Sequence, residues 1–388
     1  MKYWSPMVLV CASLVVVSLL LPAVQPQYPV LAATPIKIGV IEDTSGAASY
    51  YSQESVKGIQ LAIAELNAKG GVGDHPLETV LEDDQNKPPL SAEKLRKLAS
   101  DKDIVAILTV SGSADALQNQ KVAEEEKIPE IAPTNIVDAL TKTPLKYFFR
   151  ISPSDSDYLA FTMTTTAKKY KKVAIFTDNT QTGVAEANSY VDGLKKRGVD
   201  VVSVERVDTG ATDATPQILH MKNAGAELVL LVAQGVPELA LAARTIRSIN
   251  WNVPILGTDT VGVPSFVALA KSAANGVLFT DIIDDTKPAF QALAKRWTAR
   301  YGAKSDISTN AVESYDAVYI LAEAIAKGGG ASREQIRSGL EQTSRYEAVS
   351  GRNGSYVRFS PLSHQGMGPE SVTIRIYKNL RPSAYTGY

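Results

Sequence analysis

The residues best suited to hold a ligand lie in short polar loops, each of which follows an apolar run. In TVSGSADA, Ser111 and Ser113 supply hydroxyls and Gly112 supplies a flexible turn, directly before the helical stretch that carries Val122. Unpaired backbone N–H groups and the helix dipole at such a position both favour negative charge. The loop therefore predicts a site for a ligand carboxylate, although Ser113 could instead cap its own helix.

Three further loops follow probable strands and carry groups of the same kind. APTN contains Thr134 and Asn135, TDNTQTG contains Thr182, and GTDTVG contains Asp259. In open parallel sheets, ligands bind beyond the carboxyl ends of the strands, which is where these loops begin. A buried carboxylate such as Asp259 must be paired, and a ligand ammonium would pair it. The alternative is that Asp259 caps the segment that follows it.

The sequence offers few patterns that are typical of catalytic or metal-binding sites. The three histidines lie in unrelated surroundings, and neither an H-E-x-x-H motif nor a G-x-S-x-G elbow occurs. The chain also has no G-x-G-x-x-G or G-x-x-x-x-G-K-[ST] loop for a nucleotide. Asp83 and Asp84, followed by Asn86, Lys87 and Pro88, predict a turn more than a metal site. We therefore expect a protein that is not an enzyme and has no metal and no cofactor.

Bulk composition fits an ordinary globular protein of about two domains. The 388 residues are 45% hydrophobic and 21% charged, with a formal net charge of −1. No basic excess favours nucleic acid or an anionic membrane surface as a partner.

The first 33 residues have the layout of a secretory signal. Lys2 precedes an apolar run from Met7 to Val24, and Leu31-Ala32-Ala33 offers small residues for cleavage. An uncleaved anchor is the alternative, because the run approaches membrane-spanning length. The only cysteine, Cys11, lies inside this segment, so the mature chain would have none. We expect residues 1–33 to be removed and the protein to reside in the periplasm of a double-membraned bacterium.

Strands and helices alternate along the rest of the chain, which predicts parallel sheets covered by helices on both sides. Polar passages at Arg150–Asp157 and Asp281–Lys287 separate two such series, so two α/β lobes joined by more than one crossing segment fit this order. A helix is expected over Asn310–Lys327. The probable strands are Ile36–Ile41, Leu77–Glu82, Ile104–Val110, Val173–Thr177, Val201–Val204, Leu228–Ala233, Val253–Leu256, Val277–Thr280, Tyr356–Phe359 and Val372–Tyr377.

Five motifs, in this order, resemble the solute-binding proteins of ABC importers of the branched-chain amino-acid-binding type: IKIGVIEDTSGAAS, SVKGIQLAIAELNAKGGV, LEDDQNKP, VAEEEKIPEIAP and YFFRISPSDS. The resemblance covers nearly the whole mature chain. It implies a type I periplasmic binding protein, with two doubly wound parallel-sheet lobes joined by a three-strand hinge. Residues 34–152 with 286–344 would form the N-terminal lobe, and residues 153–285 with 345–388 the C-terminal lobe.

The resemblance also assigns roles to residues. Ser113 and its neighbours Ser111 and Ala114 would hold the ligand carboxylate, with Thr134 and Asn135 beside them. Asp259 would receive the ammonium, and Tyr51 would line the side-chain pocket. Three positions depart from the family pattern: Thr182 and Gly235 replace frequent aromatic residues, and Ile136 replaces a common threonine. The pocket is therefore expected to be less aromatic and roomier, which leaves an aromatic acid or an amide open as ligands.

We predict a monomeric periplasmic protein that closes its lobes over a small amino acid or related carboxylate and delivers it to a membrane permease. The alternative is a sensor that reports the same ligand to a membrane kinase or chemoreceptor. A hydrolase of this architecture would need a nucleophile or a metal constellation that the sequence does not offer.

Overall fold

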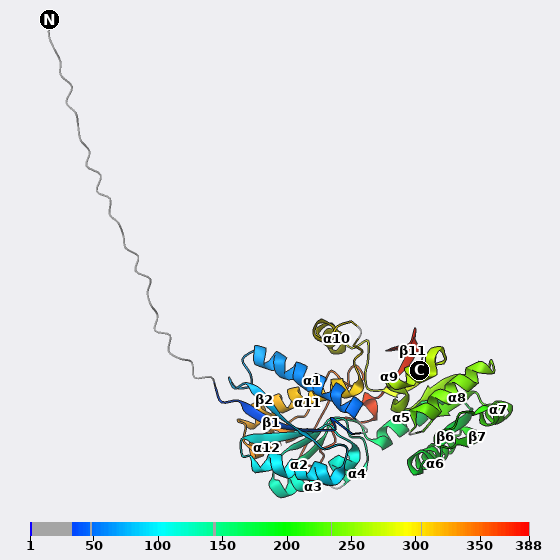
Figure 1. Cartoon of the computed structure of the whole chain (residues 1–388), viewed down its shortest axis with the longest axis horizontal. Coiled ribbons are helices and arrows are strands. Elements are labelled where there is room, and N and C mark those ends of the chain that lie inside the picture. Colours follow the sequence, from blue (N-terminus) through cyan, green and yellow to red (C-terminus); the bar gives the residue numbers. More distant parts are fainter. Residues whose placement is uncertain (2–32, 47–48, 143–144, 234, 304, 388) are drawn as a thin grey trace. The chain divides into compact units, whose positions relative to one another are not determined.

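The computed structural model describes residues 1, 33–46, 49–142, 145–233, 235–303 and 305–387 (Figure 1). The predicted signal peptide and Cys11 lie outside these residues, apart from Met1 and Ala33. In the part of the chain that is described, no helix combines the length and apolar character needed to cross a membrane.

The first sheet is parallel and has the strand order β2-β1-β3-β4-β5. Successive residues of β1 face opposite sides, as the two-residue period of a strand requires. Ile38 and Val40 pack in the core cluster that contains α1 and α11, whereas Ile41 packs with α2 and α3. The strands are β1 (Ile36–Glu42), β2 (Leu77–Asp83), β3 (Ile104–Thr109), β4 (Glu130–Ala132) and β5 (Phe148–Arg150).

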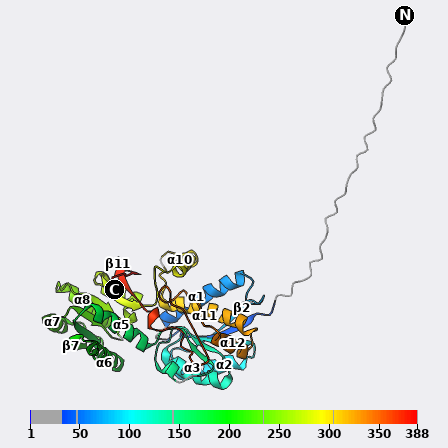
Figure 2. The same ribbon diagram turned by 180° about the vertical axis from the view of Figure 1, so that it is seen from behind.

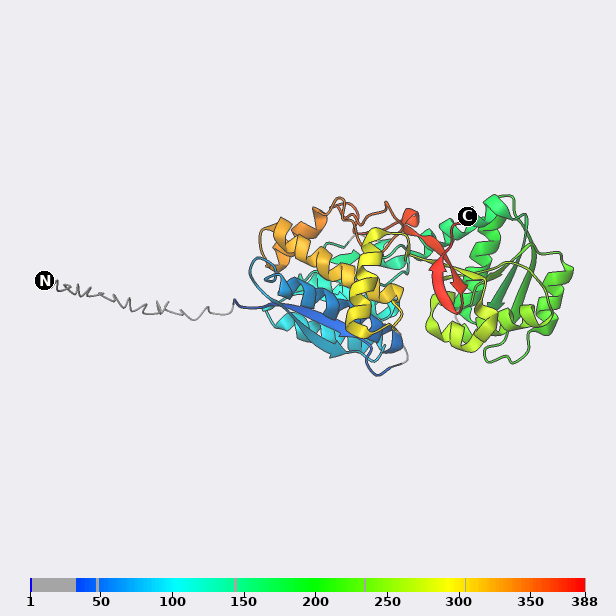
Figure 3. The ribbon, with the colours of Figure 1, turned by 90° about the horizontal axis from the view of Figure 1, so that it is seen from above.

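Helices cover both faces of this sheet, and some come from far along the chain. The long helix α11 lies beside α1, as Figure 3 shows with the blue and orange ribbons. The predicted helix Asn310–Lys327 corresponds to α11, which extends one residue further at each end. The helices are α1 (Ser49–Ala68), α2 (Pro88–Ser100), α3 (Ser113–Glu126), α4 (Ala139–Lys142), α10 (Pro288–Tyr301), α11 (Thr309–Gly328) and α12 (Arg333–Glu341).

The second sheet has the order β12-β11-β10-β9-β8-β6-β7. Strands β6 to β10 are parallel, and β11 and β12 add an antiparallel edge. The strands are β6 (Lys172–Asp178), β7 (Asp200–Val207), β8 (Leu228–Leu231), β9 (Ile255–Gly257), β10 (Val277–Asp281), β11 (Thr373–Lys378) and β12 (Arg381–Ala384).

This sheet is also covered on both faces (Figure 2). Val173 and Ile175 of β6 pack in the cluster of α5 and α6, whereas Ala174 and Phe176 pack with α7, α8 and α9. Two lobes with parallel sheets are thus confirmed. The helices are α5 (Asp155–Lys169), α6 (Gln181–Lys195), α7 (Thr215–Asn223), α8 (Val236–Ser248) and α9 (Pro264–Ala270), with short 3₁₀ turns η1 (Asp259–Gly262), η2 (Lys271–Ala274) and η3 (Pro369–Ser371).

The chain passes between the two sheets three times, and backbone hydrogen bonds join the passages. Gly366 N–H donates to Arg150 O at 2.7 Å, and Met367 N–H donates to Ile151 O at 3.0 Å. Gly351 N–H donates to Ile282 O at 2.6 Å. The third passage therefore lies against both of the others.

The third passage differs from the sequence prediction in two respects. The strand expected at Tyr356–Phe359 is wrong, because Val357 forms only an isolated bridge with Tyr346. Residues 345–388 were assigned to the second lobe, yet Phe359 and Met367 pack in the core cluster of the first sheet. Apolar side chains of this passage thus complete the first core before the chain enters β11.

Candidate ligand-binding site

Two neighbouring cavities lie at the carboxyl ends of the strands, where an open parallel sheet places its ligand. They share the lining residues Ile136, Tyr158, Asp259 and Thr280. We call the cavity of about 360 Å³ the small cavity and that of about 630 Å³ the large cavity. The small cavity is also lined by Thr134, Glu54 and Glu313, and the large one by Ser113, Thr182, Asp155 and Glu186.

The loop after β3, for which the sequence predicts an anion site, leads into the start of α3. Gly112 is the N-cap of α3, and no side chain caps this helix, so Ser113 does not have the alternative role of a cap. The Ser111 side chain is buried, and its Oγ has no hydrogen-bond partner among the described residues. Asn135 Nδ2 donates to Ser111 O at 2.7 Å, which ties the loop after β4 to the loop after β3.

The predicted site residues fall into two groups. Ser113, Thr134, Thr182 and Asp259 all line the two cavities. The others do not lie in either lining: Ser111 and Asn135 are buried behind it, Ala114 is exposed, and Tyr51 is in the first turn of α1 with a side chain outside the described structure.

Asp259 follows β9 and begins the 3₁₀ turn η1, between the two cavities. Its side chain is exposed to the cavities, but the surrounding protein limits its hydration. This desolvation, with the negative charges of Asp155 and Asp281, raises the pKa of Asp259 to about 6. A cation placed against Asp259 would stabilise its ionised form.

Two further carboxyls of the cavities were missed by the sequence analysis. Burial and the charges of Asp259 and Asp155 raise the pKa of Glu186 to about 8. Glu186 lies four residues after Thr182 on α6, so the (i, i+4) spacing could have identified it. Glu313, 2% exposed, contacts Ser152 Oγ, and burial raises its pKa well above the ordinary value. No sequence pattern around Glu313 on α11 indicated that this residue would line a cavity.

Hydroxyl groups complete the shared wall. Tyr158 is 8% exposed and Thr280 is 1% exposed, and both line both cavities. Tyr158 lies on α5, directly after the capping box that Ser154 forms with Asp157. Ile136, the departure from the family pattern, adds an apolar surface to the same wall. Over the described ranges, no group of three or more His, Cys, Asp or Glu side chains is placed to hold a metal ion.

Two α/β lobes joined by three passages, with cavities lined by residues of both, define the fold of a type I periplasmic binding protein. The chain belongs to the periplasmic binding protein family, whose sequence profile matches residues 35–369. This family relationship confirms the resemblance that the motifs indicated.

Several relatives are named for their ligands. A Leu/Ile/Val/Thr-binding protein of Salmonella typhimurium is 28% identical over 275 residues, covering 67% of this chain and 73% of the relative. A leucine-, isoleucine-, valine-, threonine- and alanine-binding protein of Pseudomonas aeruginosa is 26% identical over 329 residues, covering 84% and 86%.

A solved structure supports the fold. The branched-chain amino acid transporter substrate-binding protein LivJ from Streptococcus pneumoniae, in complex with isoleucine, has a TM-score of 0.77. It is 23% identical in sequence, with 90% of this chain and 98% of that chain covered. At this identity the likeness shows the shared fold.

Proposed function

We propose that this protein is the extracytoplasmic solute-binding component of an ABC importer and binds an α-amino acid between its lobes. Family membership and the names of the amino-acid-binding relatives support this function. Residues 1–33 direct export and are removed, and the mature monomer acts in the periplasm. It makes and breaks no bond, and it delivers its ligand to an inner-membrane permease.

One arrangement carries the proposal: anion-binding and cation-binding groups face the same pair of cavities. Ser113 and Thr134 line them from the first lobe, at a helix start and a strand end, and Asp259 lines them from the second. The ligand carboxylate would lie at the start of α3, where free N–H groups and the helix dipole favour it. The ligand ammonium would pair with Asp259.

Binding is coupled to movement of the lobes. A ligand that contacts both lobes only when they are closed stabilises the closed form and shifts the population towards it. From the core clusters, the first lobe would comprise residues 34–152 and 286–372, and the second residues 153–285 and 373–388. The three passages between them would then act as the hinge.

Calorimetric titration of residues 34–388 with neutral, acidic and basic α-amino acids tests the proposal. We expect micromolar binding, or about −8 kcal/mol, and a loss of at least about tenfold in Asp259→Asn, because one charge pair is removed. Asp200→Asn, which removes an exposed carboxylate at the start of β7, is the matched control and should bind normally. If no amino acid of any class binds, the proposed function is wrong.

Uptake measurements distinguish import from sensing. Cells that lack the gene should lose high-affinity uptake of the ligand found by titration. Unchanged uptake together with a lost transcriptional or chemotactic response to the ligand would identify a sensor instead.

A further inference from the structure

The large cavity carries more negative charge than the proposed ligand ammonium can neutralise. Four of its described lining residues are carboxylic acids, namely Asp138, Asp155, Glu186 and Asp259, and none of the described ones is lysine or arginine. A zwitterionic amino acid with a neutral side chain brings one positive and one negative charge. Such a ligand would leave the net charge of this cavity as it is.

The nearest positive side chains are held by other partners. Arg150 is 1% exposed and donates to Ile136 O at 3.0 Å, Val137 O at 2.7 Å and Gln365 Oε1. Lys57 pairs with Glu54 at 2.6 Å and lines a third cavity beyond the small one. Neither cation lines the large cavity. Although the charge of Arg150 acts on Asp138 and Asp155, no cation of the described residues lies beside Glu186 or Asp259 in its lining.

Buried hydroxyls give a second and independent indication of a polar ligand. Tyr158, Thr258 and Thr280 line the large cavity and are 8%, 7% and 1% exposed. Their hydroxyls are not among the fully enclosed unpaired polar atoms of the described chain, so these oxygens are available from the cavity. A ligand with several donors could therefore form hydrogen bonds to these oxygens.

We propose that the ligand is an α-amino acid whose side chain ends in a cation, an ammonium or a guanidinium. This inference rests on the proposed function and specifies its ligand class. The α-ammonium pairs with Asp259, where the two cavities meet, and the side chain extends into the large cavity. Its terminal cation lies between Glu186 and Asp155, and the hydroxyls of Thr258 and Tyr158 accept hydrogen bonds from the ligand.

The charge of Glu186 links binding to pH. The negative charges of Asp259, Asp155 and Asp178 help to raise the pKa of Glu186, and Tyr190 lies on the same helix as Glu186. The pKa of Glu186 is raised to about 8, so below that pH the free protein holds a proton there. A ligand cation favours the ionised carboxylate and displaces the proton. Affinity for a cationic ligand should therefore rise as the pH increases from 6 to 8.

The test compares four ligands by calorimetric titration of residues 34–388: L-lysine, L-arginine, L-leucine and 1,4-diaminobutane. We expect lysine or arginine to bind at least about tenfold more tightly than leucine. Glu186→Gln should weaken that binding by about 30-fold or more and change leucine binding by less than about threefold. Asp192→Asn removes an exposed acid from the same helix and should leave all affinities unchanged.

Each result decides between the two proposals. Leucine binding that equals or exceeds lysine and arginine binding would overturn the cationic side chain and leave the proposed function intact. Equal loss of leucine and lysine binding in Glu186→Gln would also overturn the inference. Binding of 1,4-diaminobutane alone, lost in Glu186→Gln, would keep the cation site but contradict an amino-acid carrier. If none of the four ligands binds, the inference is wrong, and the titrations with the remaining α-amino acids decide whether the proposed function also fails.

Discussion

Arg375 and Asp281 form a buried ion pair at the end of the second sheet, with 3.2 Å between Nη1 and Oδ2. Their side chains are 7% and 6% exposed. Arg375 also pairs with Asp285, with 2.8 Å between Nη2 and Oδ1. Since Asp281 and Asp285 lie where the chain leaves β10, the arginine of β11 fixes the start of the second passage between the lobes.

Arg375→Met removes this cation while keeping a side chain of similar length. Asp281 is then left buried without its positive partner, and we expect the free energy of unfolding to fall by about 3 kcal/mol. Urea denaturation measures the change. Arg381→Met, at an exposed position of β12, should cost less than about 0.5 kcal/mol. If Arg375→Met lowers the free energy of unfolding by less than about 1 kcal/mol, the hydrogen bonds from Thr309 and the Ile282 N–H are enough to stabilise the Asp281 carboxylate without the arginine.

The burial of Glu130 should give the protein an unusual dependence of stability on pH. Glu130 is fully buried in β4, where Oε1 accepts from Thr109 Oγ1 at 2.7 Å and Oε2 has no described partner. Burial raises its pKa to about 8, against the opposing effect of the Thr109 hydrogen bond. Between about pH 4.5 and 8 the folded protein therefore binds more protons than the unfolded chain, so this group makes stability fall as the pH rises.

Glu130→Gln removes the titration and keeps the acceptor for Thr109. The parent should lose stability as the pH rises from 5 to 8, whereas the variant should not. The difference in the free energy of unfolding should therefore change by on the order of 2–4 kcal/mol in favour of the variant over this range. Urea midpoints at the two pH values measure this. Glu125→Gln, at a side chain that is 63% exposed, should leave the pH dependence unchanged. A parent-like pH profile in Glu130→Gln would show that Glu130 is ionised in the folded protein.

Local sequence patterns identified most strands because their apolar runs carry the two-residue period of a strand. The runs at Ile36–Ile41 and Val173–Thr177 were located to within one residue at each end. The pattern at Tyr356–Phe359 was misleading for a physical reason. It indicates an extended backbone, but a strand also needs a partner strand, and only Tyr346 pairs there.

For the site, too, local sequence patterns predicted some residues, whereas others depend on how distant elements pack together. Ser113, Thr134 and Asp259 were predicted because each lies just after a strand, where parallel sheets bind ligands, and each lines one or both cavities. Tyr158 and Glu186 were missed because they are on helices, although the (i, i+4) spacing of Glu186 from Thr182 was a usable signal once Thr182 was a candidate. The packing of α5 and α6 on the second sheet decides which of their faces meets the cavities, and no short motif encodes that packing.

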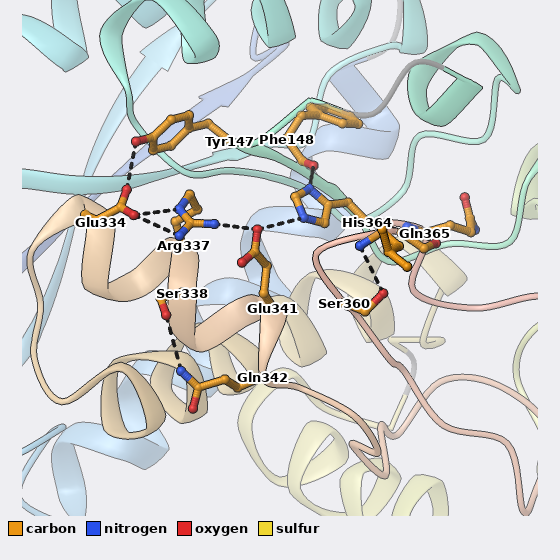
Figure 4. A network of polar contacts seen from close by, with 12 residues as sticks. Tyr147, Phe148, Glu334, Arg337, Ser338, Glu341, Gln342, Ser360, His364 and Gln365 are labelled. Carbon is orange, nitrogen blue, oxygen red and sulfur yellow. Dashed lines mark hydrogen bonds and ion pairs between the residues drawn. The ribbon is translucent and has the colours of Figure 1, made fainter.

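His364 should titrate below the ordinary range for histidine. Its ring stacks on Phe149 with 3.9 Å between centroids. Nδ1 lies 3.0 Å from Phe148 O, and Nε2 lies 3.4 Å from Glu341 Oε1 (Figure 4). Burial is the largest effect and lowers its pKa, although Glu341 acts in the opposite direction. The stabilisation from neutral His364 is thus present above the pKa of the unfolded chain and is lost as the pH falls through the folded pKa.

NMR of the imidazole nitrogens, assigned with His364→Gln, measures this pKa directly. The neutral ring should carry its proton on Nδ1, because Phe148 O can only accept. Glu341→Gln should lower the pKa further, since it removes the charge that favours the imidazolium. A pKa above 6.5 would mean that the ion pair with Glu341 outweighs burial.

Gly58 sets the distance between α1 and α11. A Cβ at this position would lie 2.1 Å from Ala311 O, so the backbone of α11 would have to move. Gly58→Ala should therefore lower the free energy of unfolding by about 1–3 kcal/mol, although alanine is the better helix former by about 1 kcal/mol. Gly193→Ala is the matched control: its Cβ would meet only the side chain of Met163, which can adopt another rotamer. Urea denaturation should show the larger loss for Gly58→Ala, and an equal or smaller loss would mean that the two helices separate at little cost.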